Sequence, residues 1–192
     1  MRRPYIGGNW KMNLDFQSAL QLTRQLKMNL MSALKCDVAI FPPAVYIHPL
    51  SEILKDSPLE IGGQNVYYKE SGAFTGELSC KMLLTSGANM VIIGHSERRH
   101  IFGETDEIVN LKMAMALSSG LLPVLCIGEK LEEREAGRTF DIITRQLQKG
   151  LADLNLEDPA KMVVAYEPVW AIGTGKNATP QQAEEVHSFI RR

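Results

Sequence analysis

Short β-like runs alternate with longer helix-like runs along the whole chain. The six β-like runs lie at Tyr5–Asn9, Asp37–Phe41, Leu59–Gln64, Met90–Gly94, Leu121–Ile127 and Met162–Tyr166. Their Val, Ile and Leu content is typical of strands that are buried on both faces, and successive parallel strands need a helical crossover between them. The pattern therefore predicts an α/β fold, in which helices cover a parallel sheet. It shows no linker, low-complexity stretch or second domain.

The helical runs carry recognisable start signals. Asp15 is a good N-cap for a helix whose apolar positions continue to Leu34. Further helices are expected at residues 46–54, with Pro49 in the first turn, and at residues 131–154. The last helix should open at Thr179, because a Thr N-cap, a proline at the next position and a glutamine at the capping-box position follow one another there.

Composition excludes several classes of function. The 192 residues are 45% hydrophobic, which is enough for one sizeable core. The 21 basic and 22 acidic residues nearly cancel to a net charge of −1 and form no basic stripe, so we expect no nucleic acid or membrane partner. No apolar run is long enough to span a bilayer. Three widely spaced cysteines (Cys36, Cys80 and Cys126), with no signal-peptide pattern, fit reduced thiols and a cytoplasmic location.

The sixth strand ends in a single carboxylate, Glu167, and a proline follows directly. Carboxylates at the carboxyl ends of parallel strands lie where α/β folds carry out chemistry. The segment after it, residues 168–176, is apolar, contains Trp170 and ends in glycines, which indicates a lid that closes over a ligand. On this segment alone, a strand-capping glutamate beside a packed loop is the more common reading.

Other strand ends supply partners for this carboxylate. Lys11 follows the first strand, where its ammonium can neutralise an anion, although most lysines are surface charges. His95 follows the fourth strand, and Ser96 is expected to cap a helix there, so that the positive helix N-terminus keeps the imidazole neutral. No His or Asp pair has a metal-binding spacing, and the nucleophile-elbow and P-loop patterns fail. One base, one neutral histidine and one lysine suit proton abstraction next to a carbonyl.

Five motifs in order carry a resemblance to a known family. They are Gly8–Asn13 (GNWKMN), Gly72–Glu77 (GAFTGE), Gly94–Arg99 (GHSERR), Cys126–Glu129 (CIGE) and Ala165–Gly175 (AYEPVWAIGTG). Together they resemble the triosephosphate isomerases. The resemblance implies a TIM (β/α)8-type barrel that interconverts dihydroxyacetone phosphate and D-glyceraldehyde 3-phosphate in glycolysis and gluconeogenesis, without cofactor or metal. This family is itself a standard example of a glutamate base beside a neutral histidine under a closing loop.

Roles carry over by position. The resemblance implies that Glu167 is the base, that His95 polarises the carbonyl, and that Lys11 and Asn9 support substrate charge and orientation. Gly173 is expected to donate its N–H to the phosphate when the 168–176 lid closes. Ser96, Glu97 and Cys126 are expected to support the site from behind. The Gly72–Glu77 loop, with Thr75 at its tip, resembles the loop through which the family forms homodimers.

Length sets the chain apart from the family. Barrels of eight units typically run to about 250 residues, whereas six units are counted here. We therefore expect one domain over residues 1–192 that is an incomplete, open parallel barrel, truncated at its C-terminus and impaired in activity. Asn177 also replaces the threonine expected in the lid hinge. Two other enzymes of the same barrel fit less well. A metal-dependent epimerase needs His and Asp ligands at the strand ends, and a Schiff-base aldolase needs a lysine near the sixth strand, where this chain has Glu167. A non-catalytic, truncated remnant of the same family stays open as the alternative.

Overall fold

The computed structural model describes residues 4–31, 35–156, 158–173 and 175–192. The chain divides into two compact units. Unit 1 comprises Met1–Ile92 and Met115–Pro123, and unit 2 comprises Ile93–Ala114 and Val124–Arg192. Strand β4 (Met90–Ile93), helix α5 (Asp106–Ser119) and strand β5 (Leu122–Ile127) pass from one unit into the other. Each unit is described by itself.

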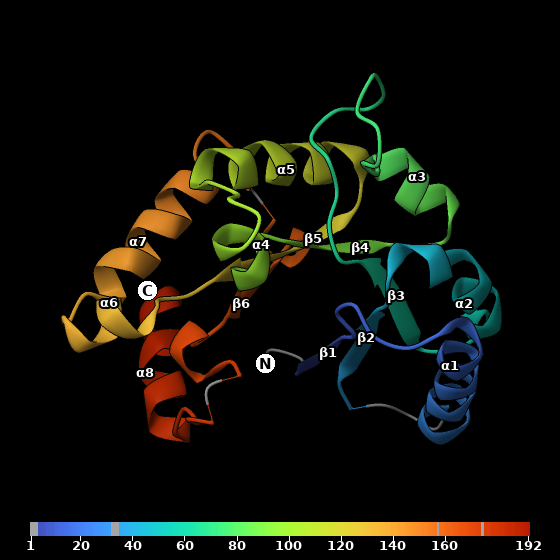
Figure 1. The fold of residues 1–192 in the computed structure, drawn as a ribbon, viewed down its shortest axis with the longest axis horizontal. Coiled ribbons are helices and arrows are strands. Elements are labelled where there is room, and N and C mark those ends of the chain that lie inside the picture. The colour runs from blue at the N-terminus through green and yellow to red at the C-terminus, as the bar shows by residue number, and fades with distance from the viewer. Residues whose placement is uncertain (1–3, 32–34, 157, 174) are drawn as a thin grey trace. The chain divides into compact units, whose positions relative to one another are not determined.

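Unit 1 holds the first three β/α repeats. Strands β1 and β2 pair in parallel over their full length, from Tyr5 opposite Asp37 to Asn9 opposite Phe41. Strand β3 continues the parallel pairing beside β2, and β4 beside β3. Helices α1 and α2 lie side by side next to these strands (Figure 1). The elements are β1 (Tyr5–Asn9), α1 (Phe16–Leu30), β2 (Asp37–Phe41), η1 (Ala44–Tyr46), α2 (Ile47–Leu54), β3 (Leu59–Gly63) and α3 (Cys80–Thr85).

Unit 2 holds the later repeats. Strands β5 and β6 pair in parallel, from Val124 opposite Val163 to Ile127 opposite Tyr166. Helix α7 packs against both α6 and α8 (Figure 1), and the Phe140 and Phe189 rings of α7 and α8 lie 4.6 Å apart. The remaining elements are α4 (Ser96–His100), α6 (Leu131–Glu135), α7 (Thr139–Gly150), η2 (Pro159–Lys161), β6 (Val163–Tyr166), η3 (Val169–Ala171) and α8 (Pro180–Ile190).

The six strands follow one another in the sheet in sequence order, β1-β2-β3-β4-β5-β6. Helical segments separate every pair of consecutive strands. Within the described residues the order ends at β1 and β6, so this is the (β/α)-barrel type of α/β fold with six units, incomplete and open. The fold class predicted from the alternating pattern is confirmed. All six strands lie within one residue of their predicted bounds at each end.

Helix ends follow local chemistry. Asp15 caps α1, because its side chain accepts a hydrogen bond from the N–H of Ser18 at 2.8 Å. Helix α1 ends at Leu30, and Leu34 lies outside the described residues. Thr179 caps α8 in a capping box with Gln182, as predicted.

One predicted helix is wrong in its extent. The segment 131–154 was expected to form a single helix, but it forms α6 and then α7. Gly137 has a φ of +69°, and its N–H donates to the carbonyl of Arg134 at 2.9 Å. A glycine in the left-handed region ends a helix in this way, since it satisfies the last carbonyls while turning the chain. The helix expected at residues 46–54 is α2, which begins one residue later than predicted, directly after the 3-10 turn η1.

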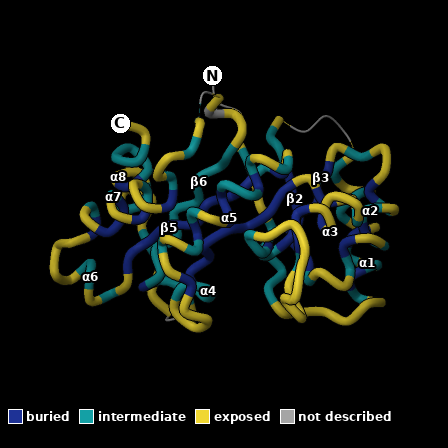
Figure 2. The backbone as a smooth tube through the Cα atoms, turned by 90° about the horizontal axis from the view of Figure 1, so that it is seen from above, coloured by how far each residue is buried: buried dark blue, intermediate teal, exposed yellow. Residues whose placement is uncertain are grey.

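Burial concentrates on the strands of both units. Strands β2 and β4 are buried along almost their whole length, and β5 is buried from Pro123 onward (Figure 2). The edge strands differ, since β1 and β6 are only half-buried or exposed. Ile6 on β1 is 57% exposed. The buried strands therefore form rigid supports for the loops at their carboxyl ends.

Candidate active site

His95 and Glu167 meet in unit 2, at the carboxyl ends of β4 and β6. The Nε2 atom of His95 lies 2.8 Å from Oε1 of Glu167. The backbone N–H of Ser96 donates to Oε2 of the same carboxylate at 2.9 Å. The side chains of His95 and Glu167 are 9% and 16% exposed. The two residues that sequence analysis chose as electrophile and base are therefore in direct contact in a nearly dry environment.

The helix cap beside the site differs from the prediction. Ser96 was expected to cap helix α4, but His95 is the N-cap, and its Nδ1 accepts a hydrogen bond from the N–H of Glu97 at 3.2 Å. A ring nitrogen that accepts a hydrogen bond holds no proton, so this contact favours the tautomer with its proton on Nε2, and Oε2 of Glu97 also lies 3.6 Å from Nδ1. The imidazole therefore points its one N–H at Glu167.

Gly94 makes this arrangement possible. Its φ of +71° turns the chain sharply between β4 and the helix cap. A Cβ at this position would lie 2.8 Å from a guanidinium nitrogen of Arg99 and 3.1 Å from Val109. Glycine is therefore required both by the backbone conformation and by the packing beneath it.

The supporting residues proposed from the sequence lie around this pair. Ser96 acts through its backbone N–H, and Glu97 supplies the N–H that fixes the imidazole. Cys126 lies at the end of β5 and is only 3% exposed. Burial, followed by the charge of Glu167, raises the pKa of the Cys126 thiol well above its usual range. Cys126 is therefore a neutral packing group and no nucleophile.

Arg99 joins the ends of two strands behind the site. Its guanidinium donates to the carbonyl of Gly94 at 2.7 Å, to the carbonyl of Cys126 at 3.2 Å and to Asp106 at 2.7 Å. The side chain is 7% exposed. A planar cation with several donors suits this task, since one group satisfies two strand-end carbonyls and one carboxylate. Sequence analysis quoted this arginine within a motif but assigned it no role.

Glu129 anchors the start of the predicted lid. Its fully buried carboxylate accepts hydrogen bonds from Trp170 Nε1 at 3.0 Å and from the Tyr166 hydroxyl at 3.0 and 3.1 Å. Arg134 lies 3.0 Å from the same carboxylate and places its guanidinium 4.8 Å from the centre of the Trp170 ring. The sequence analysis named Glu129 only as the last residue of the Cys126–Glu129 motif. A buried tryptophan N–H needs an acceptor, and that need was the available signal.

The segment predicted to form a lid follows this anchor. Trp170 is 7% exposed within η3, whereas Gly173 is exposed and has a φ of +69°. Thr174, within the predicted lid, lies outside the described residues. Among the described residues, no hydrogen bond joins Gly173 to His95 or Glu167. The role of Gly173 in phosphate binding therefore stays a prediction.

Asn9 and Lys11 belong to unit 1, at the end of β1. The Asn9 side chain accepts a hydrogen bond from the N–H of Lys11 at 2.9 Å. Gln64 donates to the carbonyls of Lys11 and Phe41, both at 2.8 Å. Lys11 has a φ of +53°, a conformation that costs a non-glycine residue of order 1–3 kcal/mol and often marks a functional position. Gln64, which the sequence treated only as the end of a strand, holds this strained backbone in place.

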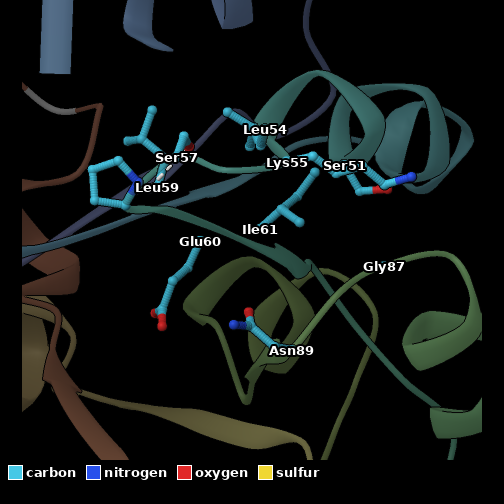
Figure 3. A pocket seen from close by; sticks show the side chains of 10 residues that line it. Ser51, Leu54, Lys55, Ser57, Leu59, Glu60, Ile61, Gly87 and Asn89 are labelled. Carbon is cyan, nitrogen blue, oxygen red and sulfur yellow. Dashed lines mark hydrogen bonds between the residues drawn. The ribbon is translucent and has the colours of Figure 1, made fainter. Parts of the chain in front are cut away.

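A cavity of about 400 Å³ also opens in unit 1 (Figure 3). It lies near the start of β3, the opposite end of that strand from Gln64, and Figure 3 shows Glu60 and Asn89 beside it. Neither of these two polar side chains is buried. The cavity thus lacks the convergent buried polar groups of a substrate site, and the chemistry of unit 1 lies at the other end of its strands.

No group of three or more His, Cys, Asp and Glu side chains in the described part of the chain is arranged to hold a metal ion. No helix there is long and apolar enough to cross a membrane.

Six parallel strands in sequence order with helical crossovers define a protein of the (β/α)-barrel class, and a carboxylate contacts a histidine at the carboxyl ends of its strands. Comparisons with known proteins give the family. The family model "Triosephosphate isomerase" matches residues 4–192. The chain belongs to the triosephosphate isomerase family, an isomerase family.

Relatives named triosephosphate isomerase match the whole chain. The chain is 46% identical over 192 residues to the protein of Endomicrobium trichonymphae, covering 100% of this chain and 77% of the relative. It is 48% identical over 191 residues to the Caldanaerobacter subterraneus protein, with the same two coverages. It is 50% identical over 192 residues to the Pseudomonas putida F1 protein, covering 100% of this chain and 76% of the relative.

Proposed function

We propose that this protein interconverts dihydroxyacetone phosphate and D-glyceraldehyde 3-phosphate by proton transfer through an enediolate. The observation that carries the proposal is the contact between His95 Nε2 and Glu167 Oε1 at 2.8 Å. A base and an N–H donor in contact can act on neighbouring atoms of one substrate, a carbon acid and its carbonyl oxygen. Membership of the family supplies the substrate class.

The reaction follows from these two groups. Glu167 removes a proton from C1 of dihydroxyacetone phosphate, and the C–H electron pair becomes the C1–C2 double bond of the enediolate. The carbonyl π electrons move to the C2 oxygen, where the Nε2–H of His95 stabilises the negative charge. Glu167 then returns the proton to C2, and transfer of the hydroxyl proton between the two oxygens through His95 leaves the aldehyde at C1. The balance closes without a cofactor.

The observed geometry adds one requirement. The Nε2–H of His95 donates to Glu167 in the structure, so substrate must replace the carboxylate at that donor. The incoming carbonyl oxygen takes the imidazole N–H, and the released carboxylate turns toward the carbon acid. Loss of the bond from the Ser96 N–H accompanies that turn. Substrate binding and activation of the base are therefore one coupled event in this proposal.

The other predicted residues serve charge and closure. Lys11 carries the positive charge that balances the phosphate and the enediolate, and Asn9 fixes the strained backbone of Lys11 through its side chain. Gly173 gives its N–H to the phosphate when the lid closes from its anchor at Trp170. Closure removes water, which strengthens each electrostatic interaction in the site.

The loop Gly72–Glu77 is proposed as the contact between two subunits. Its tip residue, Thr75, is exposed, and Phe74 is 38% exposed while its ring lies 4.6 Å from that of Tyr67. Gly72 and Gly76 take positive φ angles of +139° and +93°, which project the loop from the unit. A loop with an exposed aromatic suits insertion into a partner, so the proposed assembly is a homodimer. A cytoplasmic role in glycolysis and gluconeogenesis accompanies the proposal.

Residues 1–192 by themselves are proposed to be weak catalysts. They span 76–77% of the length of the relatives named above, and within the described residues the strand order ends at β6. In (β/α)8 barrels the loops after strands seven and eight frequently build the phosphate site. Binding energy from a distant phosphate lowers the barrier of the chemical step, so kcat as well as affinity should be low. The alternative is a non-catalytic member of the family.

The test is turnover of D-glyceraldehyde 3-phosphate by the purified chain and by Glu167→Gln, with Glu132→Gln on the exposed face of α6 as the matched control. The proposal expects turnover in the parent and control proteins, and its loss in Glu167→Gln. Equal turnover in all three would remove Glu167 from the mechanism, and none in the parent would favour the non-catalytic alternative.

A further inference from the structure

Gln146 on helix α7 is a buried amide that the proposed chemistry does not use. Its side chain is 2% exposed, and both of its polar atoms bond to one residue. Oε1 accepts from the N–H of Gly128 at 2.8 Å, while Nε2 donates to the carbonyl of Gly128 at 3.1 Å. A side-chain amide donates and accepts at once, so Gln146 fixes the N–H and the carbonyl of the same residue. The one N–H of Gly128 and its carbonyl therefore both have a partner in this buried place, and loss of the amide would leave them unsatisfied.

Gly128 in turn supports the backbone of Glu167. A Cβ added to Gly128 would lie 1.8 Å from the carbonyl oxygen of Glu167 and 2.8 Å from its carbonyl carbon. The N–H of Glu167 donates to the carbonyl of Ile127 at 2.8 Å. Both polar backbone groups of Glu167 therefore rest on residues 127 and 128, and only glycine allows the approach.

We propose that Gln146 is a positioning residue for Glu167, acting through the peptide of Gly128. The amide of Gln146 fixes the position of the Gly128 peptide. The Gly128 peptide contacts the Glu167 backbone and so fixes its position, and this position determines the distance from the Glu167 carboxylate to His95. A displacement of a reacting group by about 1 Å can cost about 100-fold in rate. The kinetic consequence rests on the proposed isomerase function, whereas the placement of the carboxylate does not.

Gln146→Glu is the sharpest variant because a carboxyl group has the shape of the amide. When protonated, it donates to the Gly128 carbonyl and accepts from the Gly128 N–H, as the amide does. When ionised, it has no donor and repels the carbonyl. Burial raises the pKa of an introduced carboxyl, so the variant changes from competent to incompetent as pH rises through that pKa. Gln148→Glu, on an exposed position of the same helix, is the matched control.

The kinetic readout is the kcat of each variant divided by the kcat of the parent protein at the same pH. This ratio cancels the effect of groups that titrate in both proteins. For Gln146→Glu we expect kcat lower by about 10-fold to 100-fold where the introduced carboxyl is ionised, with KM changed by less than about 3-fold. The ratio should rise toward unity as pH falls, and Gln148→Glu should stay near unity throughout. A flat ratio for Gln146→Glu, even with a pH-dependent stability, would overturn the proposal.

A second readout needs no turnover. The Ser96 amide donates to Glu167 at 2.9 Å, so its NMR resonance reports the position of the carboxylate. In Gln146→Glu this resonance should move with pH together with that of Gly128, and it should not do so in Gln148→Glu. If the Ser96 resonance does not shift with pH while the Gly128 resonance does, the positioning role is overturned. An inactive parent protein with coupled resonances instead overturns the isomerase function and leaves the positioning role intact.

The parent protein provides the test if Gln146→Glu does not fold. Hydrogen exchange in the native state measures the opening of the Gly128 and Glu167 amides separately. The proposal expects both amides to exchange through one opening of equal free energy. A Gly128 amide that exchanges freely while the Glu167 amide stays protected would show that the two backbones move independently, which overturns the proposal.

Discussion

Removal of the Glu129 carboxylate should destabilise the protein, because several hydrogen-bond donors lose their acceptor. In Glu129→Ala the indole N–H of Trp170 and the hydroxyl of Tyr166 lose their acceptor, and Arg134 loses its counter-ion. Each buried donor left unsatisfied costs about 1–3 kcal/mol, and breaking a buried ion pair on one side costs about 3–5 kcal/mol. Arg134 is 22% exposed and can turn to water, so we expect a total of about 3–5 kcal/mol in the free energy of unfolding.

Glu129→Gln separates charge from shape. The amide oxygen still accepts from Trp170, and the new NH2 group can donate to the Tyr166 oxygen, so only the charge with Arg134 is lost. We expect a cost of about 1–3 kcal/mol. Glu132→Ala, an exposed change on the same short helix, should stay within about 0.5 kcal/mol.

Urea unfolding followed by tryptophan fluorescence measures these costs, and the slope with denaturant concentration checks that the same surface is exposed. The indole N–H resonance of Trp170 gives the local readout, since it should move toward the value of an exposed indole in Glu129→Ala. A Glu129→Ala protein within about 1 kcal/mol of the parent, at equal slope, would contradict the reading of Glu129 as the lid anchor.

Three further changes test other parts of the account. Glu167→Gln should lower the residual kcat of the chain to near the background rate with little change in KM, because the amide accepts no proton. It should also cost about 1–3 kcal/mol in unfolding free energy, because the new NH2 group faces one of the two N–H donors that the carboxylate accepts from. Steady-state kinetics with urea unfolding decides this. Burial, followed by the charge of Glu129, raises the pKa of Tyr166 above its ordinary value of about 10. The stability that Tyr166 contributes is therefore complete below pH 10 and is lost as pH rises further. Thermal unfolding from pH 8 to 11 should show a smaller fall of Tm with pH in Tyr166→Phe than in the parent protein. Thr75→Arg should weaken the proposed homodimer by about 10-fold or more in Kd, measured by sedimentation equilibrium, and a Kd equal to that of the parent would remove this loop from the interface.

The sequence predicted the strands well because their signal is local. Runs such as Asp37–Phe41 are short, apolar and bounded by prolines or charges, so each boundary could be read within one residue. The helix starts at Thr179 and Asp15 were equally legible, whereas helix α3, which Ser79 caps, and helix α5 were not predicted. The break between α6 and α7 was missed because an isolated glycine in a charged helical run is tolerated as often as it ends the helix. The φ of +69° at Gly137 decides between these outcomes, and periodicity does not contain it.

The candidate site divides in the same way. Glu167 and His95 were predicted because each follows a strand and carries chemistry of its own. Arg99, Glu129 and Gln146 act through backbone carbonyls, an indole and a peptide that are distant in sequence, with separations such as the 41 positions from Glu129 to Trp170. Such pairings depend on which loops meet, and they have no local pattern. The N-cap at α4 was assigned to Ser96 because serine is the commoner cap, whereas the tight turn at Gly94 brings the His95 ring to that place.

The central claim is that Glu167 moves a proton on a triose phosphate, and isotope exchange tests it most directly. The purified 192-residue chain is incubated with dihydroxyacetone phosphate in D2O, and proton NMR follows the loss of hydrogen at C1, which records proton removal even where net turnover is slow. The account predicts deuterium incorporation above the buffer rate in the parent chain and incorporation at the buffer rate in a folded Glu167→Gln protein. Equal incorporation in both proteins, or none above buffer in the parent, would contradict it.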